Sequence, residues 1–422
     1  MASQTENFDT SPAPIAKAER IGTLDLIRGF AVLGILAANI IAFGQPFSAY
    51  LYPGAFLTGH DRVADWMWVA QLVLIDGKMR GLFALLFGAG LAVFAERAWA
   101  KGQTRWLQAR RLALLGGFGL IHFYFIWRGD ILFLYAASGA LAALALRWPR
   151  GRMLGLGIAG YIGAGLVYLV TFGLSHFIAE TDLREQAVWS EAAAGFDAAR
   201  DAAFADDARE AVILTQGNYA DFVHHNVSAH ATDPFVDLSL LLWESVPLML
   251  IGMALYHFGW FTGGVARTRL LGWGWAGLIA GSLLTLPVGL WVMSTGFQYW
   301  ASTSGMMAFS FFPRLLATLG LLALLCAYGA GAKGWLAERL SAAGRMAFSN
   351  YIGTSALMML IFHPWAGGLW GELTRPELYL TMAFGWAVML TWSRLWLDRF
   401  RYGPLEWLWR CLTYGERFPL RK

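Results

Sequence analysis

The chain has 422 residues, of which 57% are hydrophobic, 15% are aromatic and only 14% are charged. Soluble domains carry about 25% charged and about 45–50% apolar residues, so this composition excludes an ordinary soluble protein and predicts an all-α, polytopic membrane protein. The net charge of +4 then needs no nucleic-acid partner, and two cysteines are too few for a disulfide framework or a cysteine-rich metal site.

The first 20 residues are polar, contain two prolines and lack a basic start, so we expect a disordered cytoplasmic tail and no cleaved signal peptide. Beyond this tail, about ten stretches have the roughly 20 mostly apolar residues that cross a bilayer. We expect these membrane-spanning helices near 24–44, 79–96, 107–127, 131–147, 153–176, 238–259, 270–294, 309–332, 346–365 and 377–397.

The distribution of basic residues gives the expected topology. With both termini in the cytoplasm, most of the 32 lysines and arginines fall in cytoplasmic segments, as the positive-inside rule requires. Residues 61–76 are a further helical stretch, which we expect to lie in the membrane interface and to lead into the second span at Gly77.

One polar segment divides the membrane spans. Residues 180–236 are alanine-rich and acidic, and we expect an extracytoplasmic insert of two or three amphipathic helices. The predicted organisation is a tail at 1–20, an N-terminal membrane domain at 21–178, the insert at 179–236 and a C-terminal membrane domain at 237–422.

The first candidate for chemistry opens the first span, where Asp25 and Arg28 are three residues apart and share one helix face. Pairing lowers the cost of placing both charges at the membrane. One interpretation is a topology anchor at the interface. The other is a polar floor for an anionic cofactor, such as the phosphates of an acyl-CoA.

The second candidate is the stretch GLIHFYFIWRGDILFLYAASGA at 119–140, in which His122 precedes the triplet Arg128-Gly129-Asp130. We expect the triplet to be the outer turn between the third and fourth spans, with its charges reaching water. If Trp127 ends the third span, His122 lies about 7 Å deeper. A carboxylate that orients this imidazole would give a general base, whereas a hydrogen bond to a neighbouring helix would be purely structural.

Three other groups are weaker candidates. His60 lies in the first outer loop, on the same side as Asp130, and is either solvated or a second base. Lys78 and Arg80 either bind an anionic substrate or extend to the lipid headgroups. We expect no metal, because adjacent histidines diverge on a helix and zinc needs convergent ligands; the polar residues considered for it are Asp221, His224, His225, His230 and Asp233.

Five segments in order resemble the YeiB-like bacterial inner-membrane proteins, which carry domain of unknown function 418 in their C-terminal half. His122, Trp127, Gly129 and Asp130 match the third segment directly. The segments are RIGTLDLIRGFAVLGILAANI, LFALLFGAG, RRLALLGGFGLIHFYFIWRGDILFLYAASGAL, GRMAFSNY and FRYGPLEWLWRCLTY.

The N-terminal half also resembles transmembrane acyltransferases, notably heparan-α-glucosaminide N-acetyltransferase and acyltransferase family 3, which share the opening Leu-Asp-x-x-Arg-Gly. This resemblance implies an essential outer-loop histidine, whose location His60 matches at a shorter spacing. It implies a bacterial inner-membrane enzyme that moves an acyl or acetyl group from cytoplasmic acyl-CoA, held near Asp25 and Arg28, to a small-molecule or glycan acceptor.

In this interpretation His122, oriented by Asp130, or else His60, deprotonates the acceptor, and Trp127, Lys78 and Arg80 contact the substrate. The alternative is a small-molecule transporter that uses the same buried polar residues. The expected partners are membrane lipids and the acceptor, and assembly as a homodimer stays open.

Overall fold

The computed structural model describes residues 21–59 and 61–422. Within these ranges the regular elements are all helices, and no strand is present. Phe400 and Arg421 form an isolated β-bridge. The predicted all-α class is therefore confirmed for the described chain. The tail at 1–20 and the candidate His60 lie outside the described residues.

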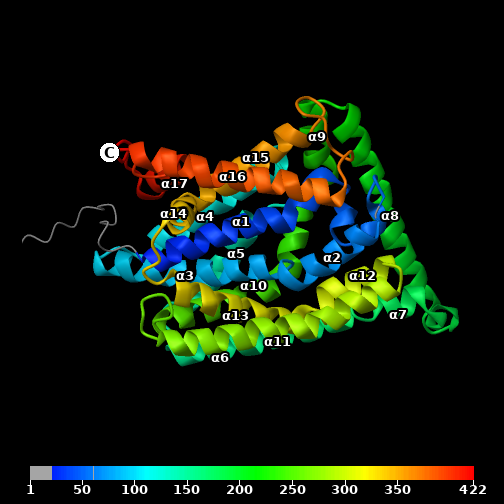
Figure 1. The fold of residues 1–422 in the computed structure, drawn as a ribbon, viewed down its shortest axis with the longest axis horizontal. Coiled ribbons are helices and arrows are strands. Elements are labelled where there is room, and N and C mark those ends of the chain that lie inside the picture. Colours follow the sequence, from blue (N-terminus) through cyan, green and yellow to red (C-terminus); the bar gives the residue numbers. More distant parts are fainter. Residues whose placement is uncertain (1–20, 60) are drawn as a thin grey trace, which may run out of the picture.

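The helices lie roughly along one direction in a single bundle (Figure 1). The N-terminal part contributes α1 (Gly22–Gly44), α2 (Arg62–Leu74), α3 (Lys78–Ala100), α4 (Arg105–Phe125), α5 (Leu132–Ala142) and α6 (Arg150–Thr171). The C-terminal part contributes α10 (Asp233–His257), α11 (Arg267–Ser294), α12 (Tyr299–Ser304), α13 (Phe311–Gly329), α14 (Trp335–Arg345), α15 (Ala347–Phe362), α16 (Arg375–Arg399) and α17 (Pro404–Tyr414).

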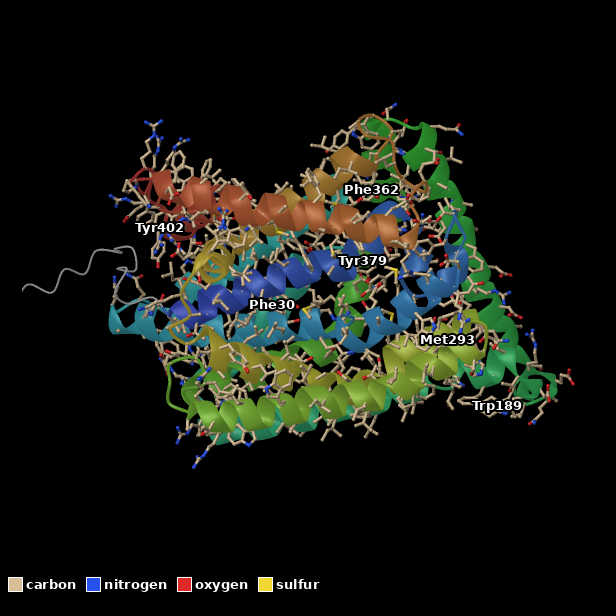
Figure 2. All side chains as sticks on the ribbon, in the orientation of Figure 1. Phe30, Trp189, Met293, Phe362, Tyr379 and Tyr402 are labelled. Atoms are coloured by element: carbon tan, nitrogen blue, oxygen red, sulfur yellow. The ribbon has the colours of Figure 1, made fainter. Side chains whose placement is uncertain are left out.

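The polar insert lies at one end of the bundle. It follows α7 (Ser175–Glu180) and consists mainly of α8 (Ser190–Gln216) and α9 (Tyr219–Ala229), which agrees with the expected number of helices. The placement of the insert outside the cytoplasm stays a prediction. Figure 1 shows α8 crossing the ends of the other helices, opposite the end that carries α17 and the C-terminus. Trp189 and Tyr402 mark these two ends in Figure 2. We call them the insert end and the C-terminal end.

Six helical stretches of the described chain are long and apolar enough to cross a membrane: Gly22–Gly44, Arg62–Ala100, Arg150–Glu180, Asp233–His257, Arg267–Ser294 and Phe311–Gly329. The other four predicted spans coincide with α4, α5, α15 and α16. Of these, α5 and α15 belong to shorter apolar helices. The membrane class is thus supported, whereas the count of ten spans and the cytoplasmic termini stay predictions.

The outer helices expose their apolar side chains. Leu166 and Val170 of α6 and Leu283 and Leu284 of α11 are each more than half exposed, and no polar side chain alternates with them to make a water-facing surface. A continuous apolar exterior of this kind is unstable in water and suits contact with lipid. The core, in contrast, takes residues from both membrane segments, because α10 packs against α3, α5 and α6. The division of these segments into two domains stays a prediction.

The break predicted at Gly77 is confirmed. Helix α2 ends at Leu74 and α3 begins at Lys78, and Gly77 between them has a φ of 70°. Glycine adopts this left-handed conformation without the steric cost that a Cβ imposes. The placement of α2 in the membrane interface stays a prediction.

A close backbone crossing fixes α1 against α14. A Cβ built on Gly29 would lie 1.9 Å from the carbonyl oxygen of Leu340, and one on Gly344 would lie 1.8 Å from that of Asp25. Small residues at such crossings let membrane helices pack backbone to backbone. Because Asp25 and Arg28 lie on this part of α1, the crossing also positions them.

We therefore expect Gly344→Val to separate α1 from α14 and to destabilise the protein by about 1–3 kcal/mol, the usual cost of overpacking. The matched control is Gly353→Val on α15, where a Cβ meets no atom within 4 Å. Tryptophan fluorescence during thermal unfolding in detergent gives the melting temperatures of both variants. Equal melting temperatures for the two variants would contradict the crossing.

Candidate functional site

The structure brings His122 and Asp130 together. His122 lies in the last turn of α4, and its Nδ1 is 2.9 Å from Oδ1 of Asp130. The other carboxylate oxygen accepts a hydrogen bond of 2.8 Å from the backbone N–H of Phe133, at the start of α5. Because Asp130 holds the first turn of α5 and His122 at once, it fixes the imidazole with the proton on Nδ1.

The second imidazole nitrogen remains available. His122 is fully buried, and its Nε2 has no hydrogen-bond partner in the described chain. A neutral imidazole that donates through Nδ1 carries a lone pair on Nε2, which can accept a proton. A buried polar atom without a partner costs free energy, which a ligand that bonds to it would recover.

Tyr351 of α15 closes this site from the side. Its ring centroid lies 5.0 Å from that of His122. Its hydroxyl donates to the carbonyl oxygen of Gly129 at 3.3 Å and accepts from the backbone N–H of Ile131 at 3.1 Å. Tyr351 therefore fixes the turn that carries Asp130, which gives a physical role to the GRMAFSNY segment.

Arg128 lies under the insert, and this corrects the expectation that the charges of the turn reach water. Its guanidinium lies 2.6 Å from Glu210 and 3.2 Å from Asp206, both on α8, and 4.3 Å from the ring of Phe47. The side chains of Arg128 and Asp130 are only 10% and 1% exposed. Sequence reasoning missed this because it treated the turn and the insert as separate segments.

The histidines of the insert gather at the same place. Ligand atoms of Asp206, His225 and His230 lie within 4.8 Å of one another. However, the guanidinium of Arg128 is 3.3 Å from Nε2 of His230, and a cation there opposes a bound metal. Of the other residues considered in the sequence, His224 is exposed, Asp221 accepts from the N-cap of α9, and Asp233 bonds to His230.

A cavity of about 610 Å³ opens near the C-terminal end, between α1, α3, α4, α15 and α17. Asp25 and Arg28 both line it and form an ion pair of 3.6 Å. Most of the charged groups in its lining are basic. They are Arg28, Arg97, Lys101, Arg111, Arg345 and Arg410, against the acids Asp25 and Glu406.

The cavity runs from this basic end toward His122. Along α3 its lining extends from Lys101 to Phe83, which is about 27 Å by helical rise. Its lining also includes Leu132, two residues after Asp130, and Tyr351, which contacts His122. Apolar side chains form most of this deeper part. Asp25 and Arg28 thus line the cavity, whereas His122 and Asp130 lie next to its deep end, behind Tyr351 and Leu132.

The other predicted substrate contacts do not line this cavity. Trp127 is buried and stacks on Phe43 with centroids 4.0 Å apart. Nζ of Lys78 donates to the carbonyl oxygen of Leu72 at 2.5 Å. Arg80 forms an ion pair of 2.6 Å with Glu244 of α10. Their role in substrate binding stays a prediction.

Sequence reasoning missed several residues of the cavity. Arg111 and Phe94 were not singled out, and Trp409 and Arg410 follow the last predicted span. The only signal was that the RRLALL and FRYGPLEWLWRCLTY segments contribute to the resemblance. Their convergence depends on the packing of α17 against α4, which no local pattern reveals.

The fold and these sites define a helical membrane protein with a buried histidine–aspartate pair and a basic cavity. A family model described as a protein of unknown function (DUF418) matches residues 255–416. The uncharacterized protein YeiB of Escherichia coli K12 is 31% identical over 95% of this chain and 98% of its own length. YxaH of Bacillus subtilis 168, also uncharacterized, is 28% identical over 98% of this chain and 99% of its own length.

The chain therefore belongs to the YeiB-like DUF418 family, as the sequence segments predicted. No solved structure matches the chain.

The ion pairs of Arg128 give a prediction about stability. Burial raises the pKa of the Glu210 carboxyl above its usual value, although the charge of Arg128 opposes this rise. We expect Arg128→Gln to cost about 3–5 kcal/mol, because it leaves the buried carboxylate of Glu210 without its ion-pair partner. Thermal unfolding at pH 8 measures this cost, and Arg128→Gln combined with Glu210→Gln should recover part of it.

The pH dependence has a definite sign. Without Arg128 the pKa of Glu210 rises further, so the folded state binds its proton more tightly than the unfolded state. The stability of Arg128→Gln should therefore increase as the pH falls from about 8 to about 5, by more than that of the native chain. The control is Arg209→Gln, at an exposed arginine on α8 beside Glu210. This variant should change the stability and its pH dependence little.

Proposed function

We propose that this protein is an acyltransferase of the bacterial inner membrane. It moves an acyl or acetyl group from acyl-CoA, bound at the cytoplasmic side, to a hydroxyl or amine of an extracytoplasmic or membrane-embedded acceptor. The observation that carries this proposal is the cavity whose lining begins at basic residues around Arg28 and extends to Tyr351 and Leu132, beside the His122–Asp130 pair.

The charge of the cavity supports a phosphate-bearing donor. Arginines present several N–H donors in a fixed plane, which suits phosphate oxygens. The apolar lining beyond them suits the uncharged arm and the acyl group of the donor. The positive-inside rule assigns this basic end to the cytoplasm, where acyl-CoA is available.

The His122–Asp130 pair, next to the deep end of the cavity, suits general base catalysis. Nε2 of His122 accepts the proton of the acceptor hydroxyl or amine as that atom attacks the thioester carbonyl. The carbon–sulfur bond then breaks, and the leaving CoA thiolate receives this proton from the imidazolium of His122. The carboxylate of Asp130 stabilises the positive charge on His122 during this exchange.

We expect His122→Ala to lower the rate of thiol release from acetyl-CoA by about 10²–10⁴-fold, the usual contribution of a positioned base. The assay uses the full chain in phosphatidylcholine nanodiscs, glucosamine as a probe acceptor and a thiol reagent. His224→Ala, an exposed histidine on α9, is the matched control.

The variant and the control should have similar melting temperatures, so that a loss of rate is not a loss of fold. If His122→Ala releases thiol at the native rate, His122 is not the base. If the native chain neither binds nor consumes acyl-CoA of any chain length, the acyltransferase proposal itself is wrong.

A second cluster of buried charges favours transport of a small molecule as the alternative. Arg80 and Arg314 both pair with Glu244, at 2.6 Å and 3.4 Å. A π-helical segment at Gly305–Phe309 precedes Arg314, and Gly77 breaks the helix before Arg80. Transporters place substrate and ion sites where broken helices meet buried charges, and a Cβ on Gly77 would lie 2.3 Å from Arg314.

Transport predicts uptake of an unaltered solute by proteoliposomes. Labelled acetate and glucosamine are suitable probes, and Glu244→Gln should abolish their uptake because it leaves the buried Arg314 and the partly exposed Arg80 without their carboxylate. Glu338→Gln, at an exposed glutamate, should transport like the native chain. Transport would be contradicted if neither probe accumulates while acetyl-CoA is consumed.

A further inference from the structure

We infer that Arg111 and Arg410, together with Trp409, form a second phosphate site in the cavity, which recognises a phosphomonoester such as the ribose 3′-phosphate of CoA. This inference rests on the proposed function and makes it more specific. It assigns the FRYGPLEWLWRCLTY segment, which the acyl transfer itself does not use, to recognition of the donor.

Arg111 is held between two aromatic rings. Its guanidinium carbon lies 4.5 Å from the centroid of Phe94 on α3 and 4.5 Å from that of Trp409 on α17. The indole N–H of Trp409 also donates to the carbonyl oxygen of Arg111 at 2.9 Å. Stacking holds the planar guanidinium by its faces and leaves its N–H edge to bind an anion.

Arg410 also lies against aromatic rings, which come from the segments flanking α17. Its guanidinium carbon lies 5.0 Å from the ring centroid of Tyr402 and 5.4 Å from that of Phe418. Its Nε is buried and has no hydrogen-bond partner within the described chain. Neither Arg410 nor Arg111 forms an ion pair among residues 21–59 and 61–422, which is unusual for arginines in a partly buried position.

The nearby acid does not neutralise them. Oε1 of Glu406 accepts hydrogen bonds from the backbone N–H groups of Phe348, at 2.8 Å, and Ser349, at 3.0 Å. Its Oε2 accepts from the hydroxyl of Ser349. Glu406 thus satisfies the first turn of α15, and the positive charge of Arg111 and Arg410 is left for a ligand.

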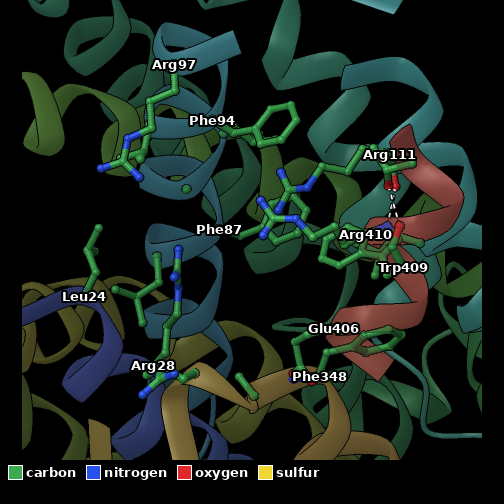
Figure 3. Close-up of a pocket in the computed structure, with 18 of the residues that line it drawn as sticks. Leu24, Arg28, Phe87, Phe94, Arg97, Arg111, Phe348, Glu406, Trp409 and Arg410 are labelled. Carbon is green, nitrogen blue, oxygen red and sulfur yellow. Dashed lines mark hydrogen bonds between the residues drawn. The ribbon is translucent and has the colours of Figure 1, made fainter. Parts of the chain in front are cut away.

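The arginines lie in two groups on different sides of the cavity. Figure 3 shows Arg28 and Arg97 on one side, with Arg111 and Arg410 next to each other on the other side and Phe87 close by. Two separate cationic groups fit a ligand with two separate phosphate groups. CoA has this chemistry, because its diphosphate and its ribose 3′-phosphate occupy different positions on the molecule.

The test compares CoA with dephospho-CoA, which lacks only the 3′-phosphate. The full chain in phosphatidylcholine nanodiscs should bind CoA about tenfold or more tightly than dephospho-CoA, since one charge-assisted phosphate contact contributes at least this much. Arg410→Gln and Arg111→Gln should each remove most of this preference. Arg110→Gln, at the exposed neighbouring arginine of α4, should keep it.

The affinity for dephospho-CoA reports whether each variant is folded, because it should be nearly unchanged. Equal affinities of the native chain for the two nucleotides would overturn the second phosphate site and leave the acyltransferase proposal standing. Binding of neither nucleotide would overturn both. Cardiolipin, a phospholipid with two phosphodiester groups, is the other source of two separate phosphates. If it binds in dependence on Arg111 and Arg410 whereas CoA does not, the site is a lipid site and the inference is wrong.

Discussion

The structure depends on the cost of burying charge in an apolar bundle, and the contact between His122 and Asp130 meets this cost at the candidate site. Asp130 is 1% exposed, yet both carboxylate oxygens are used, by His122 and by the backbone at the start of α5. Arg128 in the same turn is matched by Glu210 and Asp206 of the insert. The carboxylates of α8 thus compensate the positive charge of Arg128, and these ion pairs hold the insert against the membrane helices.

The basic cavity shows the opposite arrangement, because its positive charges exceed its negative ones. A surplus of arginines is tolerated where aromatic rings hold the guanidinium groups and where the cavity opens toward polar surroundings. Arg111 and Arg410 meet this description, with rings from α3 and from α17 and its flanking segments around them. An anionic ligand would relieve the mutual repulsion of these groups, so the cavity is better suited to a phosphate-bearing molecule than to a neutral one.

The cluster around Glu244 and the basic cavity differ in how far their positive charges are matched by carboxylates. In the cluster of Arg80, Glu244 and Arg314, both arginines form an ion pair with the one carboxylate, close to two helix breaks. The lining of the cavity instead has more basic than acidic side chains, and the imidazole of His122 next to its deep end has a nitrogen without a partner in the described chain. Ion pairs of the first kind are compatible with a purely structural role, which is why the cavity carries the proposed chemistry.

The sequence by itself determined the membrane class, the helical class, the positions of the helices and the break at Gly77, because each depends on local composition and on the intrinsic freedom of glycine. It also identified His122 with Asp130 and Asp25 with Arg28, since each pair lies within a few residues. Only the tertiary structure decided that Arg128 is buried by α8 and that Trp409 and Arg410 reach Arg111. The contacts of Arg128 with Asp206 and of Trp409 with Arg111 join residues 78 and 298 positions apart. They depend on which helix covers which surface, and the periodicity of a single segment does not encode this.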